Sequence, residues 1–143
     1  MALPNGAGGY QLGDGNLNEP VLGYLAVPLT EAGTSTVTLT AAEVTGGILV
    51  ANPGTTGTTY TMPIVVTAGG VAGVNDSVPS AKVGSTFNWT VVNIGTSTGD
   101  ITLAAGTGTG WTIVGSLTIN DGTSASFVAR KTSDTTWTLY RTA

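Results

Sequence analysis

The chain has 143 residues, of which only 8% are charged, and it contains 22 Gly, 27 Thr, no His and no Cys. A chain of this length fits one domain with one hydrophobic core. The lack of His and Cys excludes the usual zinc sites, disulfides, thiol nucleophiles and His-based catalytic triads.

The charge and hydropathy patterns exclude two further classes of partner. Four basic and eight acidic residues give a net charge of −4, whereas binding to a phosphate backbone needs clustered Lys and Arg. The longest apolar runs cover about four residues, and a membrane helix needs about 20. We therefore expect no nucleic-acid partner and no membrane span. The N-terminal residues also show no secretory signal.

Residues 1–23 are predicted to form an extended N-terminal arm. Glycine and proline interrupt this segment, which follows neither a strand period nor a helix period. Asp14-Gly15-Asn16 begins like a calcium-binding loop, but Glu19 and Leu25 stand where such a loop needs Gly and a bidentate Glu. We therefore predict turns or intersubunit hydrogen bonds for these side chains, with no metal and no cofactor.

Residues 24–143 are predicted to form a single β-sandwich domain, which begins with short strands. Residues 35–40 alternate Thr with Val and Leu, and residues 48–52 and 58–62 are two further strands that end in proline-containing turns. Thr40 and Glu43 have the spacing of a capping box, which predicts one short helical turn that ends at Gly46-Gly47. Residues 64–82 are interrupted by glycine and proline and are predicted to be a long connection.

The second half of the chain shows clearer alternation of apolar and polar residues. The predicted strands cover residues 85–94, 100–104, 111–114, 116–119, 124–131 and 135–141. Short strands at this spacing indicate an all-β sandwich or barrel with at most one short helical turn. Four aromatic residues fall on the apolar face of these strands and are predicted to be buried in the core, namely Phe87, Trp89, Phe127 and Trp137.

No pattern in the sequence predicts catalysis. The eight carboxylates could contain a glycosidase pair, but no spacing selects two of them. The glycine-rich residues 106–110 lack the Lys-Ser/Thr and the helix of a phosphate-binding loop. The aromatic residues could form a stacking platform for sugars, although a sandwich core is the favoured interpretation.

Three stretches resemble capsid decoration (cement) proteins of tailed bacteriophages. They are the arm MALPNGAGGYQLGDGNLNE, the stretch TLTAAEVTGGILVANPGTTGTTYTMP at residues 38–63, and residues 83–141 from VGSTFNWT to TLYR. The last stretch is also similar to domains of phage fibres. Residues 64–82 depart from the pattern, because related domains have a more helical, Ala-rich segment there.

The resemblance implies a small β-sandwich or jelly-roll protein, commonly trimeric, on the outer surface of the capsid over junctions between major capsid proteins. We accordingly expect two partners, the major capsid protein and further copies of this chain, and no enzymatic activity. The expected contact residues lie in the arm: Leu3, Pro4, Asn5, Tyr10, Leu12, Asp14, Asn16 and Leu17. The alternative is a receptor- or glycan-binding module of a phage head or tail fibre.

Overall fold

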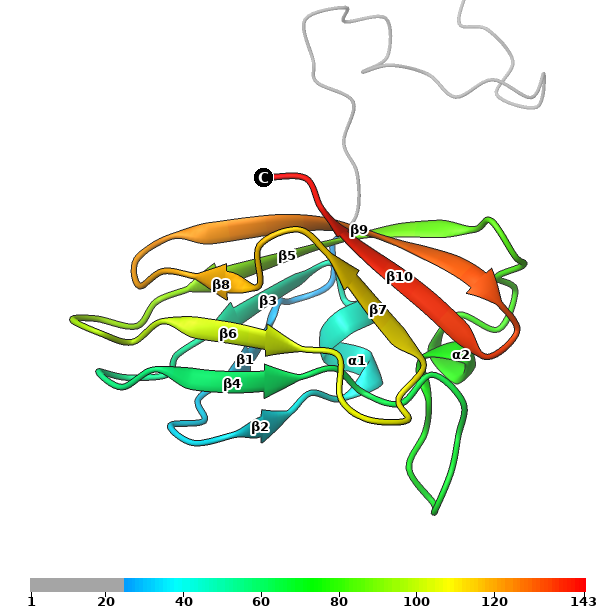
Figure 1. Ribbon diagram of the computed structural model, residues 1–143, viewed down its shortest axis with the longest axis horizontal. Helices are drawn as coiled ribbons and strands as arrows, with labels where there is room; N and C mark the ends of the chain where they lie inside the picture. The colour runs from blue at the N-terminus through cyan, green and yellow to red at the C-terminus, as the bar shows by residue number, and fades with distance from the viewer. Residues whose placement is uncertain (1–24) are drawn as a thin grey trace, which may run out of the picture.

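The computed structural model describes residues 25–143, which form two β-sheets packed face to face (Figure 1). The six-stranded sheet, here sheet A, has the order β1 (Leu29–Glu31), β3 (Ile48–Ala51), β5 (Thr86–Asn93), β9 (Ser124–Ser133), β10 (Thr136–Arg141) and β7 (Trp111–Val114). The four-stranded sheet B has the order β2 (Val37–Thr38), β4 (Thr58–Thr61), β6 (Ile101–Ala104) and β8 (Thr118–Ile119). This arrangement confirms the prediction of a predominantly β two-sheet fold.

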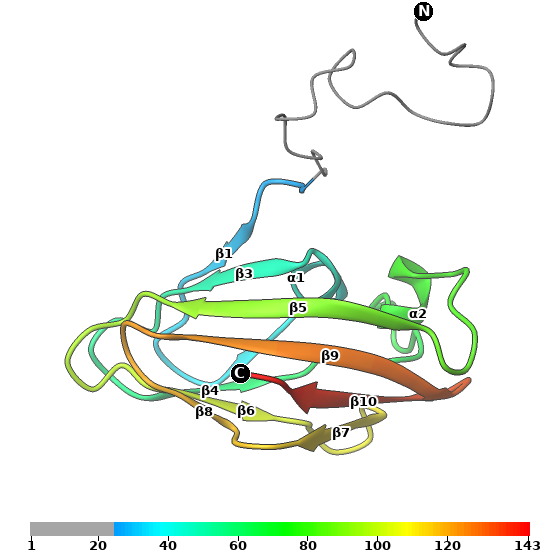
Figure 2. The same cartoon turned by 90° about the horizontal axis from the view of Figure 1, so that it is seen from above.

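The chain crosses from one sheet to the other after almost every strand. From β1 to β9 the strands alternate between sheets A and B, and only β9 and β10 follow one another within one sheet. Strands in successive crossings therefore run in the same direction, so that β1, β3 and β5 are parallel in sheet A and β2, β4 and β6 are parallel in sheet B. Figure 2 shows the chain passing between the two layers. A jelly roll is built from antiparallel strands, so the jelly-roll prediction is wrong in this respect.

The core lies between the two sheets and follows from the two-residue alternation of the strands. In β5, Trp89, Val91 and Asn93 point inward, while Thr90 and Val92 point outward. Val91 pairs with Leu49 on one side and Ala125 on the other, and all three side chains are at most 1% exposed. Tyr60, Ile101 and Leu103 of sheet B face this layer and are buried in the same way.

The predicted aromatic core is confirmed at three of its four positions. Trp89, Phe127 and Trp137 are at most 1% exposed, and the Trp89 and Phe127 rings pack with their centroids 5.5 Å apart. Phe87, near the start of β5, is only half-buried, because one side of its ring lines a pocket. The prediction of burial in the core is therefore met only in part by Phe87, whose ring contacts Trp137 at the margin of the core.

The predicted helical turn is present as α1 (Ala41–Thr45). The Thr40 hydroxyl accepts a hydrogen bond from the Glu43 N–H at 3.3 Å, and the Glu43 carboxylate accepts one from the Thr40 N–H at 2.6 Å. Both hydrogen bonds of the capping box are therefore made. Val44 of α1 is fully buried against the core, which anchors the turn to the space between the sheets.

Two elements were not predicted from the sequence. Residues 64–82 contain a second short helix, α2 (Val74–Ser77), so the expectation of at most one helical turn is wrong. No side chain caps α2, and Gly73 at its N-terminus gives no capping signal. Strand β1 is the other missed element, because its three residues are too few to show alternation. It is recognised only by its pairing with β3.

Replacing Trp89 with Ala is expected to lower the free energy of unfolding by about 3–5 kcal/mol, because a large buried side chain leaves a cavity. Phe87→Ala is the matched control and should cost clearly less, since Phe87 is only half-buried. Urea unfolding of both variants measures the difference. Equal losses at the two positions would contradict this description of the margin of the core.

Candidate binding surfaces around α2 and on sheet B

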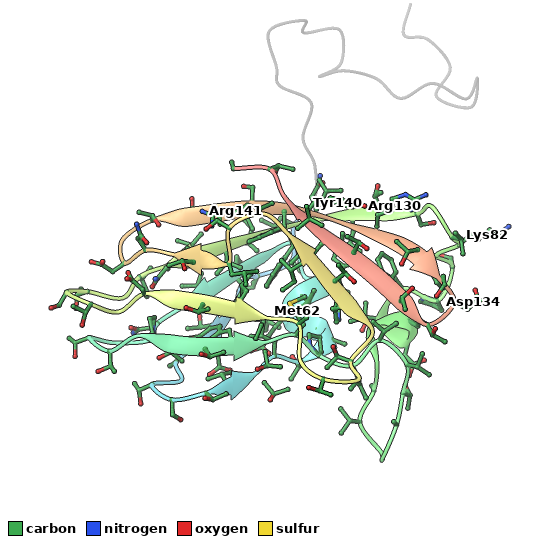
Figure 3. The ribbon with its side chains drawn as sticks, in the orientation of Figure 1. Met62, Lys82, Arg130, Asp134, Tyr140 and Arg141 are labelled. Atoms are coloured by element: carbon green, nitrogen blue, oxygen red, sulfur yellow. The ribbon has the colours of Figure 1, made fainter. Side chains whose placement is uncertain are left out.

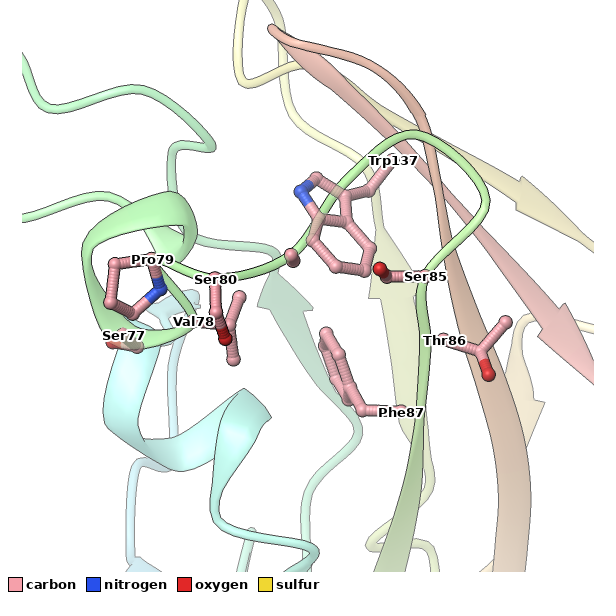
Figure 4. A pocket seen from close by; sticks show the side chains of 9 residues that line it. Ser77, Val78, Pro79, Ser80, Ser85, Thr86, Phe87 and Trp137 are labelled. Carbon is pink, nitrogen blue, oxygen red and sulfur yellow. The ribbon is translucent and has the colours of Figure 1, made fainter.

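A pocket of about 380 Å³ opens beside α2 at one end of sheet A (Figure 4). Its lining combines hydroxyl groups with an apolar wall and contains no charged side chain. It consists of Ser77, Val78, Pro79, Ser80, Ala81, Ser85, Thr86, Phe87 and Trp137. This volume lies at the lower end of the range of roughly 300–1,000 Å³ found for small-molecule sites. We call it the α2 pocket.

Asn75 of α2 holds the pocket in shape. Its side-chain oxygen accepts a hydrogen bond from the Trp137 indole at 3.0 Å, and its side-chain nitrogen donates to the Asp134 carbonyl at 2.8 Å. One residue therefore ties α2 to β10 and to the turn that precedes it. The segment that follows α2 is fixed as well, because the buried Lys131 Nζ donates to the Ala81 carbonyl at 3.0 Å. The pocket wall is thus rigidly positioned on sheet A.

A hairpin-like loop precedes α2 and projects beyond the outline of both sheets in Figure 1. We call residues 66–72 the finger. Ala68 and Val71 exchange two backbone hydrogen bonds, and Gly69 and Gly70 between them have φ values of 59° and 79°. Two positive φ values are what a two-residue type I′ turn requires. Val66 and Val71 are 47% and 60% exposed, and the finger carries no charge.

The base of the finger is fixed to the body of the protein. The N–H groups of Val74 and Asn75 donate to the carbonyls of Ile64 and Val65, both at 3.0 Å. The Thr67 hydroxyl accepts from the Gly73 N–H at 2.9 Å and donates to the Asp76 carboxylate. A side chain at Gly73 would lie 2.4 Å from the Val65 carbonyl oxygen, so the two chains approach closely at this point. The finger therefore has a rigid base and an exposed apolar tip.

The outer face of sheet B is uncharged and consists almost entirely of threonine. Thr38, Thr61 and Ala104 form one cross-strand row, and Thr59, Thr102 and Thr118 form a second. These six side chains alternate with the buried residues of their strands and therefore point outward. We call them the threonine face. Lys82, Arg130 and Asp134, by contrast, lie at one end of sheet A (Figure 3).

Two carboxylates that no sequence spacing connects lie together beside β1. Burial of Glu31 and the nearby negative charge of Glu43 raise the pKa of Glu31. Burial and these same two carboxylates also raise the pKa of Tyr60 to about 12. Glu43 is moreover engaged in the capping box, which favours a structural role for the pair.

The sequence-predicted contact residues of the arm lie outside the described residues. These are Leu3, Pro4, Asn5, Tyr10, Leu12, Asp14, Asn16 and Leu17. Within residues 25–143, no group of three or more acidic side chains could hold a metal ion. None of the described helices is long and apolar enough to cross a membrane.

Neither the α2 pocket nor the finger was predicted from the sequence. One signal was present, because Gly69-Gly70 between short apolar stretches is a typical hairpin turn. Comparison with known proteins found no family model, no curated protein and no solved structure that matches the chain.

Replacing Glu31 with Gln is expected to raise the melting temperature at about pH 7 and to change it little at about pH 4. The raised pKa means that the fold favours the protonated form, so stability from this group is present below its ordinary pKa of 4.5 and is lost as the pH rises. Asp134→Asn, at an exposed acid in the β9–β10 turn, is the control. Thermal melts at both pH values check the expectation, and an equal change at both pH values would contradict it.

Proposed function

We propose that this chain is a decoration (cement) protein of a tailed-bacteriophage capsid. It binds the outer surface of the head and stabilises contacts between major capsid proteins. The observation that supports this proposal best is the threonine face, a rigid and uncharged surface. The sequence resemblance supports the same assignment.

The threonine face is suited to permanent contact with another protein. Long charged side chains lose conformational entropy when an interface immobilises them, and buried charges must also lose their hydration. Threonine avoids both costs, because its side chain is short and is already restricted within a strand. Its hydroxyl can still accept or donate a hydrogen bond across the interface. A face of this kind fits a lattice in which the protein stays bound.

The proposed mechanism is mechanical. The threonine face lies on the capsid proteins, and the arm reaches neighbouring capsid or decoration subunits. Binding energy is thus added across seams that packaged DNA strains. The protein is proposed to be a homotrimer, so that each trimer presents three threonine faces. Many trimers on one head give high avidity even when a single contact is weak.

The alternative function is recognition of a receptor or glycan on the host. The tryptophans give this alternative little support, because Trp89, Trp111 and Trp137 are at most 7% exposed and cannot present a stacking face. The α2 pocket does favour it, since the half-buried Phe87 ring lies among serine hydroxyl groups. Cosedimentation with heads that lack this protein, compared with binding to host cells, separates the two functions.

Replacing Thr59 and Thr102 together with Lys is expected to lower occupancy on such heads at least about tenfold, because unpaired ammonium groups would be buried in the interface. The fold should persist, since both side chains point outward. Thr138→Lys is the matched control, as Thr138 points outward from β10 of sheet A. Unchanged occupancy of the double variant would show that another surface binds the capsid.

Removal of residues 1–23 is expected to leave a folded protein that no longer fills its sites on heads. Each apolar arm residue, such as Tyr10 or Leu12, contributes about 1.5–3 kcal/mol if it is buried against a neighbour. Circular dichroism reports the fold, and cosedimentation of the same sample reports binding. Full occupancy without the arm would show that the two-sheet domain alone is sufficient.

A further inference from the structure

We propose that copies of this chain associate through the finger of one copy, which inserts into the α2 pocket of another. The inference rests on the proposed function only for the expectation that several copies act together. The inference names the residues through which the copies would contact one another, and the sequence analysis did not identify these residues. The partner at this surface is a second copy of the same chain.

The finger has the properties of a preformed binding element. Its base is held by the hydrogen bonds of Val74 and Asn75, so little conformational freedom is lost when its tip is bound. Val71 at the tip is 60% exposed, and no charged side chain would have to lose its hydration on insertion. A rigid, uncharged tip of this kind fits an uncharged pocket of similar size.

The α2 pocket offers matching chemistry. Val78, Pro79 and Phe87 provide an apolar wall for valine, and serine hydroxyl groups at the margin can pair with the backbone of a hairpin tip. Its volume of about 380 Å³ accommodates small side chains such as those of Val71 and Ala72. Asn75 and Lys131 fix its walls, so the pocket is present before a partner arrives.

The finger cannot reach the pocket of its own chain. Ser77, the first residue of the pocket lining, is the last residue of α2 and lies only six residues after Val71. Bending the tip into that pocket would break the backbone bonds that join Val74 to Ile64 and Asn75 to Val65. Insertion between copies keeps these bonds and is therefore favoured.

Finger and pocket are neighbouring segments of one chain, so the contact can close in two ways. Two copies can exchange fingers reciprocally in a two-fold dimer, or copies can join head to tail and close into a ring when the rotation permits. A closed ring of three copies would bury three fingers in three pockets. Such a ring is the form of this contact that agrees with the homotrimer of the proposed function.

The absence of cysteine allows a direct test by crosslinking. Val71→Cys and Ser80→Cys are made in separate full-length chains, one with a size tag, then mixed and oxidised. A mixed disulfide is expected between them. Val114→Cys replaces Val71→Cys in the matched control, because Val114 is 48% exposed and belongs to neither surface. A Val71–Ser80 pair that crosslinks no better than the control pair overturns the proposal.

Two substitutions test the same contact without crosslinking. Val71→Asp removes the apolar tip, and Ser80→Trp fills the pocket from an exposed position. Each is expected to weaken self-association at least about tenfold, a change of about one decade in the dissociation constant. Val114→Asp is the control for the added charge. Sedimentation measures association, and circular dichroism shows whether each variant is folded.

The outcomes separate this contact from the proposed function. Self-association that survives either Val71→Asp or Ser80→Trp overturns the contact, even if the protein still binds heads. Failure of the unaltered chain to bind heads, with crosslinking intact, overturns the decoration function alone. Binding of a neutral oligosaccharide that Ser80→Trp abolishes while self-association is unchanged also overturns the contact, and it would assign the pocket to glycan recognition.

Discussion

Three indole hydrogen bonds hold together the segments that connect the two sheets. Trp89, Trp111 and Trp137 all project from sheet A, and their N–H groups donate to the Glu43 carbonyl, the Pro63 carbonyl and the Asn75 side chain at 2.8–3.0 Å. All three acceptors lie where the chain crosses from sheet B back to sheet A. An unpaired buried donor costs about 1–3 kcal/mol, so the three bonds fix two crossing segments, one through Glu43 and the other through Pro63 and Asn75. The position of α2, and with it the finger and the pocket, depends on these bonds.

The sequence predicts the strands well because their signal is local. Alternation such as that of Phe87, Trp89 and Val91 needs only a few neighbouring residues, and a capping box such as that of Thr40 and Glu43 needs four. The sheet to which each strand belongs is not predicted in this way. A turn shows that the chain reverses, but it does not show whether the next strand pairs with the previous one. The parallel pairing of β3 with β5 depends on contacts 42 residues apart, from Ile48 to Thr90, which no local pattern contains.

The candidate sites were harder to predict for a related reason. The carboxylates of Glu31 and Glu43 meet because β1 pairs with β3, which follows α1, and their separation in sequence has no meaning outside this fold. The finger did have a local signal in Gly69-Gly70, but glycines there were interpreted as interruptions of a strand. The α2 pocket combines residues 77–87 with Trp137 and becomes visible only when β10 is placed. These candidate sites consist of residues that the fold brings together and that no sequence spacing connects.

The scarcity of charge links the fold to the proposed assembly. A surface of threonine with exposed valines keeps fewer ionic groups in water than most soluble domains do, which lowers the cost of covering that surface and weakens the repulsion that keeps copies apart. The rigid finger adds direction, because a tip fixed by Val74 and Asn75 can point to only one place on a neighbour. The threonine face and the finger have no residue in common, so under this proposal one copy binds a shell and an adjacent copy at once. Each contact then raises the effective concentration for the other, and two modest interfaces hold the protein more firmly than either alone.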